Sequence, residues 1–122
     1  MRRSTVEPIR VKRAYDEPKP SDGLRVLVDR LWPRRLARAT AAIDLWLKEI
    51  APSAELRKWF AHDARKWKEF CRRYAEELDA KPQPIAALRG AIRRGTVTLL
   101  FAAKDKERNN AVALQQYLLN TT

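Results

Sequence analysis

The chain of 122 residues has one cysteine, one histidine and three glycines. The single cysteine cannot form an internal disulfide, and one cysteine with one histidine falls short of a zinc-binding set. Glycines at positions 23, 90 and 95 complete neither a Walker loop nor a G-x-G-x-x-G turn, and no G-x-S-x-G or H-E-x-x-H motif is present. We therefore expect no metal and no cofactor, and we expect any phosphate to be held by side chains and a helix end.

Long apolar runs are also missing. No stretch approaches the roughly 20 apolar residues of a membrane-spanning helix. The polar and basic residues at the start of the chain are not followed by the apolar segment of a secretory signal. We expect a cytoplasmic protein without membrane contact, in which residues 1–8 are a flexible segment and residues 9–122 form a single domain. The sequence leaves the oligomeric state open.

Positive charge is abundant, because 26 Lys and Arg side chains face 15 Asp and Glu side chains for a formal net charge of +11. This balance favours an anionic small molecule or nucleic acid as the partner. The alternative is that a basic proteome or a requirement for solubility sets the charge. Between residues 65 and 77 the charges alternate in sign at a spacing of four, which is typical of a solvated helix face. The uncompensated charge forms three clusters: Arg34, Arg35 and Arg38; Arg89, Arg93 and Arg94; and Lys104, Lys106 and Arg108. These clusters are the candidate anion surface.

Apolar periodicity predicts strands at both ends of the domain and helices between them. We expect strands at 9–15, 24–29 and 96–102 and helices at 40–50, 54–61, 63–78, 84–94 and 109–119, with Thr40, Ser53 and Asp63 as N-caps. The loop at 16–23 is too short for a crossover helix, so the strands on either side of it are expected to be antiparallel if they are neighbours. The fold class is therefore α/β: a small single domain with a short, mostly buried sheet of about three strands packed with about five helices.

The strand predicted at 24–29 ends abruptly in charged and aromatic side chains. Ligands of open α/β sheets bind beyond the carboxyl ends of the strands. We expect Arg30 and Arg34 to hold an anion and Trp32 to stack on a base or sugar. Asp29 is expected to orient one of these arginines or to act as a general base. The alternatives are an ion pair that fixes the loop and core packing of Trp32.

His62 is the other acid/base candidate, because it lies in a turn between two predicted helices and histidine titrates near neutral pH. Its alternative role is to pack or cap the helix junction. Cys71 belongs to an apolar helix face, where a thiol is inert. Trp46 and Trp67 fall on apolar stripes, so we expect them in the core.

A second group of candidate ligand-binding residues follows the strand at 96–102: Lys104, Asp105 and Asn109. A helix N-terminus attracts anions, so a phosphate at Asn109 with Lys104 or Arg108 beside it is one interpretation. Helix capping by Asn109 is the other. If the strands at 24–29 and 96–102 are parallel neighbours, the two groups of residues meet at one edge of the sheet.

These features predict a protein with an anion- or phosphate-binding cleft at the carboxyl edge of its sheet. If Asp29 and His62 transfer protons, the protein is an enzyme that acts on a nucleotide or phosphorylated small molecule, and the sequence leaves turnover open. The alternative is a non-catalytic nucleic-acid-binding module that uses the arginine clusters at 34–38 and 89–94. A third possibility is an accessory protein that binds another protein through exposed aromatic side chains.

Five segments carry a family resemblance: V-K-R-A-Y from position 11, D-G-L-R-V-L-V-D-R-L-W-P-R from position 22, D-L-W-L-K-E-I-A-P-S from position 44, E-L-R-K-W-F-A-H-D from position 55, and L-L-F-A-A-K-D followed by N-N-A-V-A-L. The chain resembles the YeaO-like branch of the domain-of-unknown-function 488 family over nearly its whole length. The resemblance implies a small prokaryotic α/β domain without a settled biochemical activity. The chain departs from the family pattern D-R-L-W-P-R-G at Arg35, which stands in place of the glycine. If that glycine supplies a positive φ or a close backbone approach, the arginine changes the shape of the loop.

Overall fold

The computed structural model describes residues 9–120. The predicted flexible segment 1–8 lies outside these residues. In the described part, one sheet contains four parallel strands in the order β1-β4-β2-β3. The strands are β1 (Ile9–Arg13), β2 (Leu24–Leu27), β3 (Leu45–Trp46) and β4 (Val97–Phe101). The α/β class is confirmed, with one strand more than the three predicted.

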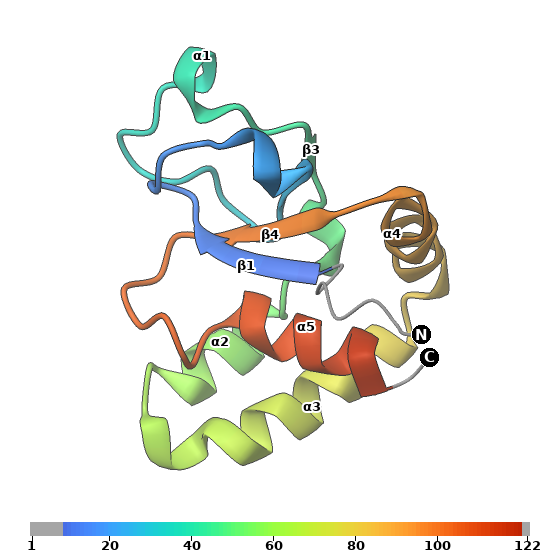
Figure 1. Cartoon of the computed structure of the whole chain (residues 1–122). Helices are drawn as coiled ribbons and strands as arrows, with labels where there is room; N and C mark the ends of the chain where they lie inside the picture. The colour runs from blue at the N-terminus through green and yellow to red at the C-terminus, as the bar shows by residue number, and fades with distance from the viewer. Residues whose placement is uncertain (1–8, 121–122) are drawn as a thin grey trace.

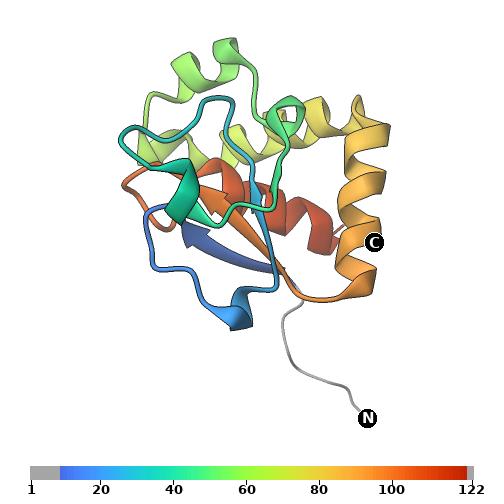
Figure 2. The same ribbon diagram turned by 90° about the horizontal axis from the view of Figure 1, so that it is seen from above.

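Five α-helices and three short 3-10 helices accompany the sheet within residues 9–120. The α-helices are α1 (Arg38–Ala41), α2 (Ala54–Phe60), α3 (Trp67–Asp79), α4 (Pro82–Arg94) and α5 (Asn110–Asn120), and the 3-10 helices are η1 (Pro20–Asp22), η2 (Lys48–Ile50) and η3 (Ala64–Lys66). Figure 1 shows α5 directly beneath β1 and β4, with α3 on the far side of α5. Seen from above, α4 stands at one end of the sheet (Figure 2).

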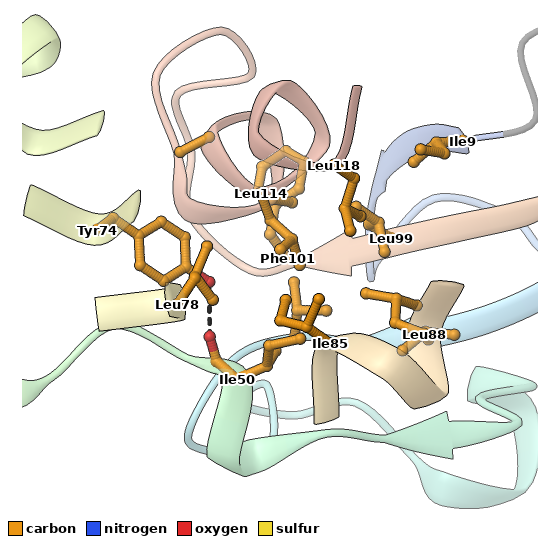
Figure 3. Close-up of a cluster of buried hydrophobic side chains, with 14 of the residues drawn as sticks. Ile9, Ile50, Tyr74, Leu78, Ile85, Leu88, Leu99, Phe101, Leu114 and Leu118 are labelled. Atoms are coloured by element: carbon orange, nitrogen blue, oxygen red, sulfur yellow. Dashed lines mark hydrogen bonds between the residues drawn. The ribbon is translucent and has the colours of Figure 1, made fainter. Parts of the chain in front are cut away.

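The main core lies between the sheet and the helices α2 to α5. Successive strand residues face opposite sides, so Val26 and Leu99 point toward this helical layer. Figure 3 shows Leu99 with the buried side chains of the helices around it. The Tyr74 hydroxyl, in α3, donates a hydrogen bond of 2.6 Å to the carbonyl oxygen of Ile50. This bond satisfies a buried polar group and ties α3 to the segment that follows β3.

A smaller apolar cluster covers the opposite face of the sheet. It is formed by Leu27, Leu100 and Ala14, against which the partly buried Trp32, Leu36, Ile43 and Trp46 pack. On this face the sheet is therefore covered by the loop and the short helix α1 between β2 and β3, and not by a long helix. The sheet is covered on both faces, as the nearly continuous apolar sequence of β4 requires.

The prediction of a helix at 40–50 is wrong. The chain forms the short helix α1, leaves it at Ala42 in the left-handed conformation (φ 52°, ψ 41°), and then pairs with β2 as the edge strand β3. Leu47 donates its backbone N–H to the Leu27 carbonyl at 2.9 Å instead of to a helical partner. Thr40, the expected N-cap, lies inside α1. The apolar residues that suggested one helix face are divided between the two clusters on opposite faces of the sheet, since Ile43 and Trp46 pack in one and Leu47 and Ile50 in the other.

The predicted strands at 9–15 and 24–29 both exist, but they are not neighbours. The strand β4 lies between β1 and β2 and is parallel to both. The antiparallel pairing expected of neighbours therefore does not arise. The connection passes through η1 and then Gly23, which has φ 65°. A Cβ atom at Gly23 would overlap the Thr96 carbonyl group, so only glycine lets the chain enter β2 so close to β4.

Candidate functional site

The carboxyl ends of β2 and β4 lie side by side, because Leu27 of β2 is in register with Leu100 of β4. Segments that leave these two strands therefore start at the same edge of the sheet, on the side where the arrow of β4 ends in Figure 1. This confirms the predicted parallel pairing. The residues after Val28 and those after Phe101 meet at that edge.

Asp29 joins the two strand ends to the last helix. Its Oδ2 atom accepts a hydrogen bond of 2.9 Å from the backbone N–H of Ala102, and its Oδ1 atom accepts one of 3.0 Å from the side-chain amide of Asn110. The same amide nitrogen of Asn110 donates to the Val28 carbonyl at 3.0 Å. We call this arrangement the Asp29 clip. Burial raises the pKa of Asp29 above its ordinary value, although both hydrogen bonds act in the opposite direction.

Trp32 contacts other residues of the protein on several sides. Its indole N–H donates to the Leu36 carbonyl at 2.7 Å, and its ring meets Trp46 edge to face with 5.5 Å between the centroids. The guanidinium of Arg38 lies 4.2 Å from the centre of the Trp32 ring. These contacts favour the packing role of Trp32 over stacking on a base or sugar. In the same loop, Arg35 has a positive φ of 62° at the position of the family glycine.

A cavity of about 730 Å³ opens at this sheet edge. Six of the eight predicted site residues line it: Asp29, Arg30, Trp32, Arg34, His62 and Asn109. The other two, Lys104 and Asp105, do not line it. The structure thus brings the predicted acid/base candidates Asp29 and His62 to the same cavity as the predicted anion-binding arginines.

Two cations that α2 contributes to the cavity, Arg57 and Lys58, were not predicted from the sequence. The sequence held one signal for Arg57. No acidic residue lies three or four positions away from it, so a helix would give it no ion-pair partner of its own. It is close enough to Asp29 for its charge to lower the pKa of that carboxyl. Arg108 also lines the cavity. The sequence had placed it in the third basic cluster and beside a phosphate at Asn109.

The cationic side chains of the cavity differ in how they are neutralised. Arg108 lies 3.3 Å from Asp105, whose pKa is lowered by hydrogen bonds from the backbone N–H groups of Glu107 and Arg108. Asp105 therefore positions Arg108 from outside the cavity. Within residues 9–120, four other lining cations have no carboxylate within ion-pair distance: Arg30, Arg34, Arg57 and Lys58.

Asn109 caps α5, which was the structural alternative for this residue. Its side-chain oxygen accepts from the Val112 N–H at 2.9 Å, and its side-chain nitrogen donates to the Asp105 carbonyl at 2.9 Å. The buried Asn109 side chain fixes the start of α5, whose first residue, Asn110, also lines the cavity. The positive end of the α5 dipole thus lies beside the four cations.

His62 lies in a strained turn at the end of α2. Both Ala61 and His62 have positive φ angles, 48° and 58°, a conformation that side chains other than glycine adopt at a cost. The imidazole is exposed, with its centroid 6.3 Å from that of the buried Phe60 ring. After the turn, Asp63 caps η3 by accepting from the Arg65 N–H, as predicted for this residue.

Other candidate features stay structural. Burial raises the pKa of the half-buried Cys71 thiol to about 11, which agrees with an inert cysteine. In the described part of the chain, no three His, Cys, Asp or Glu side chains gather as a metal site would require. The helices described here are too short or too polar to cross a membrane.

Comparison with known proteins identifies the family. A family profile described as "Inactive DUF488-N3 subclade" matches residues 8–122. The uncharacterized protein YeaO of Escherichia coli is 41% identical over 110 residues, which cover 90% of this chain and 96% of YeaO. The uncharacterized protein Rv3073c of Mycobacterium tuberculosis is 40% identical over 110 residues, which cover 90% of this chain and 92% of that protein. No solved structure matches the chain. With its D-G-L-R-V-L-V-D-R-L-W-P-R segment forming the inner strand β2 and the loop after it, the chain belongs to the YeaO-like branch of the DUF488 family.

Proposed function

We propose that this protein binds a small anionic ligand, a nucleotide or another phosphorylated small molecule, in the cavity at the carboxyl edge of its sheet. One observation carries the proposal. Four cationic side chains without an ion-pair partner in the described structure converge on one cavity from two different segments, the loop after β2 and the helix α2.

Like charges gathered in this way repel one another, and the repulsion is relieved when an anion enters. Guanidinium groups of Arg30, Arg34 and Arg57 are suited to phosphate or carboxylate, because they donate paired hydrogen bonds in a fixed plane. The N-terminus of α5 adds a partial positive charge on the same side. Asp29 is the one acidic residue among the side chains that line the cavity, and both its oxygen atoms already accept hydrogen bonds.

A more specific proposal is that the protein is an enzyme in which Asp29 and His62 transfer protons. Two observations favour binding without turnover. The carboxylate of Asp29 is occupied by the Asp29 clip, which supports a positioning role for it. The matching family profile carries the description "Inactive".

The direct test is a thermal-shift screen of the purified chain against nucleotides, sugar phosphates, simple anions and short oligonucleotides, at low and at high salt. A ligand that binds only the folded state raises the melting temperature by mass action. We expect a salt-tolerant shift from at least one small anion. Calorimetry should then show roughly 10- to 100-fold weaker binding for Arg57→Ala or Arg34→Ala, since each variant loses charge-assisted hydrogen bonds worth about 1.5–3 kcal/mol.

The matched control is Arg93→Ala, which removes an exposed arginine of α4 that does not line the cavity. It should bind the small anion as tightly as the unmodified chain. Equal losses in Arg93→Ala and Arg57→Ala would show that overall charge, and not the cavity, is responsible.

Nucleic-acid binding is the second candidate, supported by the exposed cluster Arg34, Arg35 and Arg38. The other predicted cluster lies apart from it, because Arg93 and Arg94 end the helix that leads into the start of β4, whereas Arg34 lies beyond the end of β2. Affinity for a polyanion falls steeply with salt, since counterions are released on binding. Thermal shifts from every oligonucleotide that vanish at high salt, without a shift from any small anion, would favour this candidate.

A further inference from the structure

Part of the cavity lining is apolar, in contrast to its cationic side chains, and we call it the apolar wall. We use this name for six lining residues: Ala51, Pro52, Ala54, Phe60, Ala102 and Ala103. They come from the segment that leads into α2, from the first and last residues of α2 and from the chain just after β4. Four of the six are alanines, whose small side chains leave the space open. A ligand that fills the cavity must therefore lie against hydrocarbon as well as against charge.

The backbone groups of the apolar wall are largely used by the protein itself. The Ala51 carbonyl accepts from the ammonium of Lys81 at 3.1 Å. The carbonyls of Ala102 and Ala103 both accept from the guanidinium of Arg13, at 3.0 and 2.9 Å. The Ala102 N–H is held in the Asp29 clip. Hydroxyl groups of a ligand placed here would lose their water and find few partners, which is unfavourable.

The cavity is also much larger than a phosphate group needs. Its volume of about 730 Å³ falls within the range of roughly 300–1,000 Å³ that is usual for sites of whole organic ligands. An inorganic anion bound to the cations would leave the apolar wall in contact with water. A ligand with an apolar body would remove that water and gain affinity from the area it buries.

We infer that the ligand is an anion with an apolar body, aromatic or aliphatic, and is neither a polyphosphate nor a simple sugar phosphate. Its charged group is bound by Arg30, Arg34 and Arg57, and its body lies against the apolar wall. This inference rests on the proposed function, because it requires that the cavity bind an anion. It narrows the class of ligand, because the apolar wall is expected to contact the hydrocarbon part of the ligand.

The test compares three probes by calorimetry on the full chain at physiological salt: phenyl phosphate, ribose 5-phosphate and inorganic phosphate. The three share the phosphate and differ in what is attached to it. We expect phenyl phosphate to bind at least roughly tenfold more tightly than either of the others, given the apolar area of a phenyl ring. Equal affinities for the three probes would overturn the inference while leaving the proposed function standing.

Two wall variants locate the effect. Ala103→Leu fills the space beside β4, and Ala54→Leu does so from the exposed first residue of α2, where leucine is a good helix former. Each should weaken phenyl phosphate about tenfold and leave inorganic phosphate within about twofold. The second variant keeps the test usable if the first fails to fold. Unchanged affinity for phenyl phosphate in a folded variant would show that its ring lies elsewhere and would overturn the inference.

Arg57→Ala separates this inference from the proposed function. It should weaken all three probes alike, because they share the phosphate. If no probe binds, or if Arg57→Ala and Arg34→Ala leave all three affinities unchanged, the proposed function fails and the inference fails with it.

Discussion

Arg35 adopts a backbone conformation that suits glycine better than arginine. Its φ of 62° lies in the left-handed region, which costs a side-chain-bearing residue about 1–2 kcal/mol. The preceding residue, Arg34, has its carbonyl held by the Tyr15 hydroxyl at 2.9 Å, so the loop cannot relax freely at this point. A glycine at position 35 would adopt this conformation without that cost, whereas this chain adopts it with an arginine.

We predict that Arg35→Gly stabilises the protein by about 1 kcal/mol relative to Arg35→Ala. Both variants remove the same charge, but only glycine relieves the left-handed strain. Urea denaturation measures the two free energies of unfolding. If the alanine variant proves as stable as the glycine variant, the loop does not hold position 35 in the left-handed region.

At the scale of elements, the side of the sheet away from α5 depends on one buried carboxylate. Asp22, at the end of η1, accepts hydrogen bonds from Arg25 in β2 at 2.6 Å and from Lys12 in β1 at 2.9 Å. Its backbone carbonyl accepts from the Thr98 hydroxyl of β4 at 2.7 Å. Arg25 in turn donates to the carbonyls of Ala41 and Ala42 at the end of α1. The carboxylate and the backbone carbonyl of Asp22 together thus connect three strands, and Arg25 extends the contact to the turn before β3.

Asp22→Asn should destabilise the protein by about 3–5 kcal/mol at neutral pH, because it leaves the buried Arg25 and the partly buried Lys12 without a counter-charge. Burial opposes ionisation of Asp22, but the hydrogen bonds from Lys12, Lys19 and Arg25 outweigh it and lower its pKa below the ordinary 3.8. A lowered pKa stabilises the folded state at pH above 3.8, and this contribution is lost as the pH falls through the lowered value. Urea denaturation should therefore give the full difference at neutral pH and a shrinking one below pH 3.8.

The control is Asp63→Asn, which alters an ion pair whose arginine side chain is 90% exposed. It should change stability little, since asparagine also caps a helix and solvent screens the pair. A similar loss in both variants, or a loss at Asp22 that is independent of pH, would contradict the role assigned to the buried network.

At the scale of the whole molecule, the Asp29 clip connects distant segments of the chain at the sheet edge where the cavity lies. It joins segments 73 and 81 residues apart in the chain, from β2 to the end of β4 and to α5. The residues next to this contact include Arg30 and Arg108, which both line the cavity. The geometry of the cavity therefore depends on a contact that forms only when the sheet is complete.

We predict that Asp29→Ala costs about 1–3 kcal/mol of stability, because the Ala102 N–H loses its acceptor and the release of a buried charge offsets only part of that loss. Hydrogen exchange should show faster exchange at the Ala102 amide than in the unmodified chain, with amides in α3 less affected. Glu107→Ala, at an exposed carboxylate near the same edge, is the control and should stay within about 0.5 kcal/mol. Unchanged exchange at Ala102 would show that the Asp29 clip does not hold the edge.

The sequence by itself determined the elements whose partners are local. Ser53 and Asp63 cap helices as predicted, since a cap satisfies N–H groups two or three residues away. The apolar stripe of α3 and the buried strand β4 were also predictable from periodicity and composition. The charged and aromatic residues at the end of the segment at 24–29 were predicted as site residues, and four of them line the cavity: Asp29, Arg30, Trp32 and Arg34.

Tertiary structure alone decided what depends on distant partners. The residues after Ala42 became an edge strand because β2 offered unpaired backbone groups, and the apolar spacing at 43–50 is compatible with both outcomes. The parallel pairing of β4 with β2 decided that the residues after these two strands share one edge of the sheet. Lys104 follows β4 but does not line the cavity. Arg57 and Lys58 also line the cavity because of tertiary packing. The sequence of a short helix does not indicate which strand edge the helix will face, because the packing of the whole chain fixes that contact.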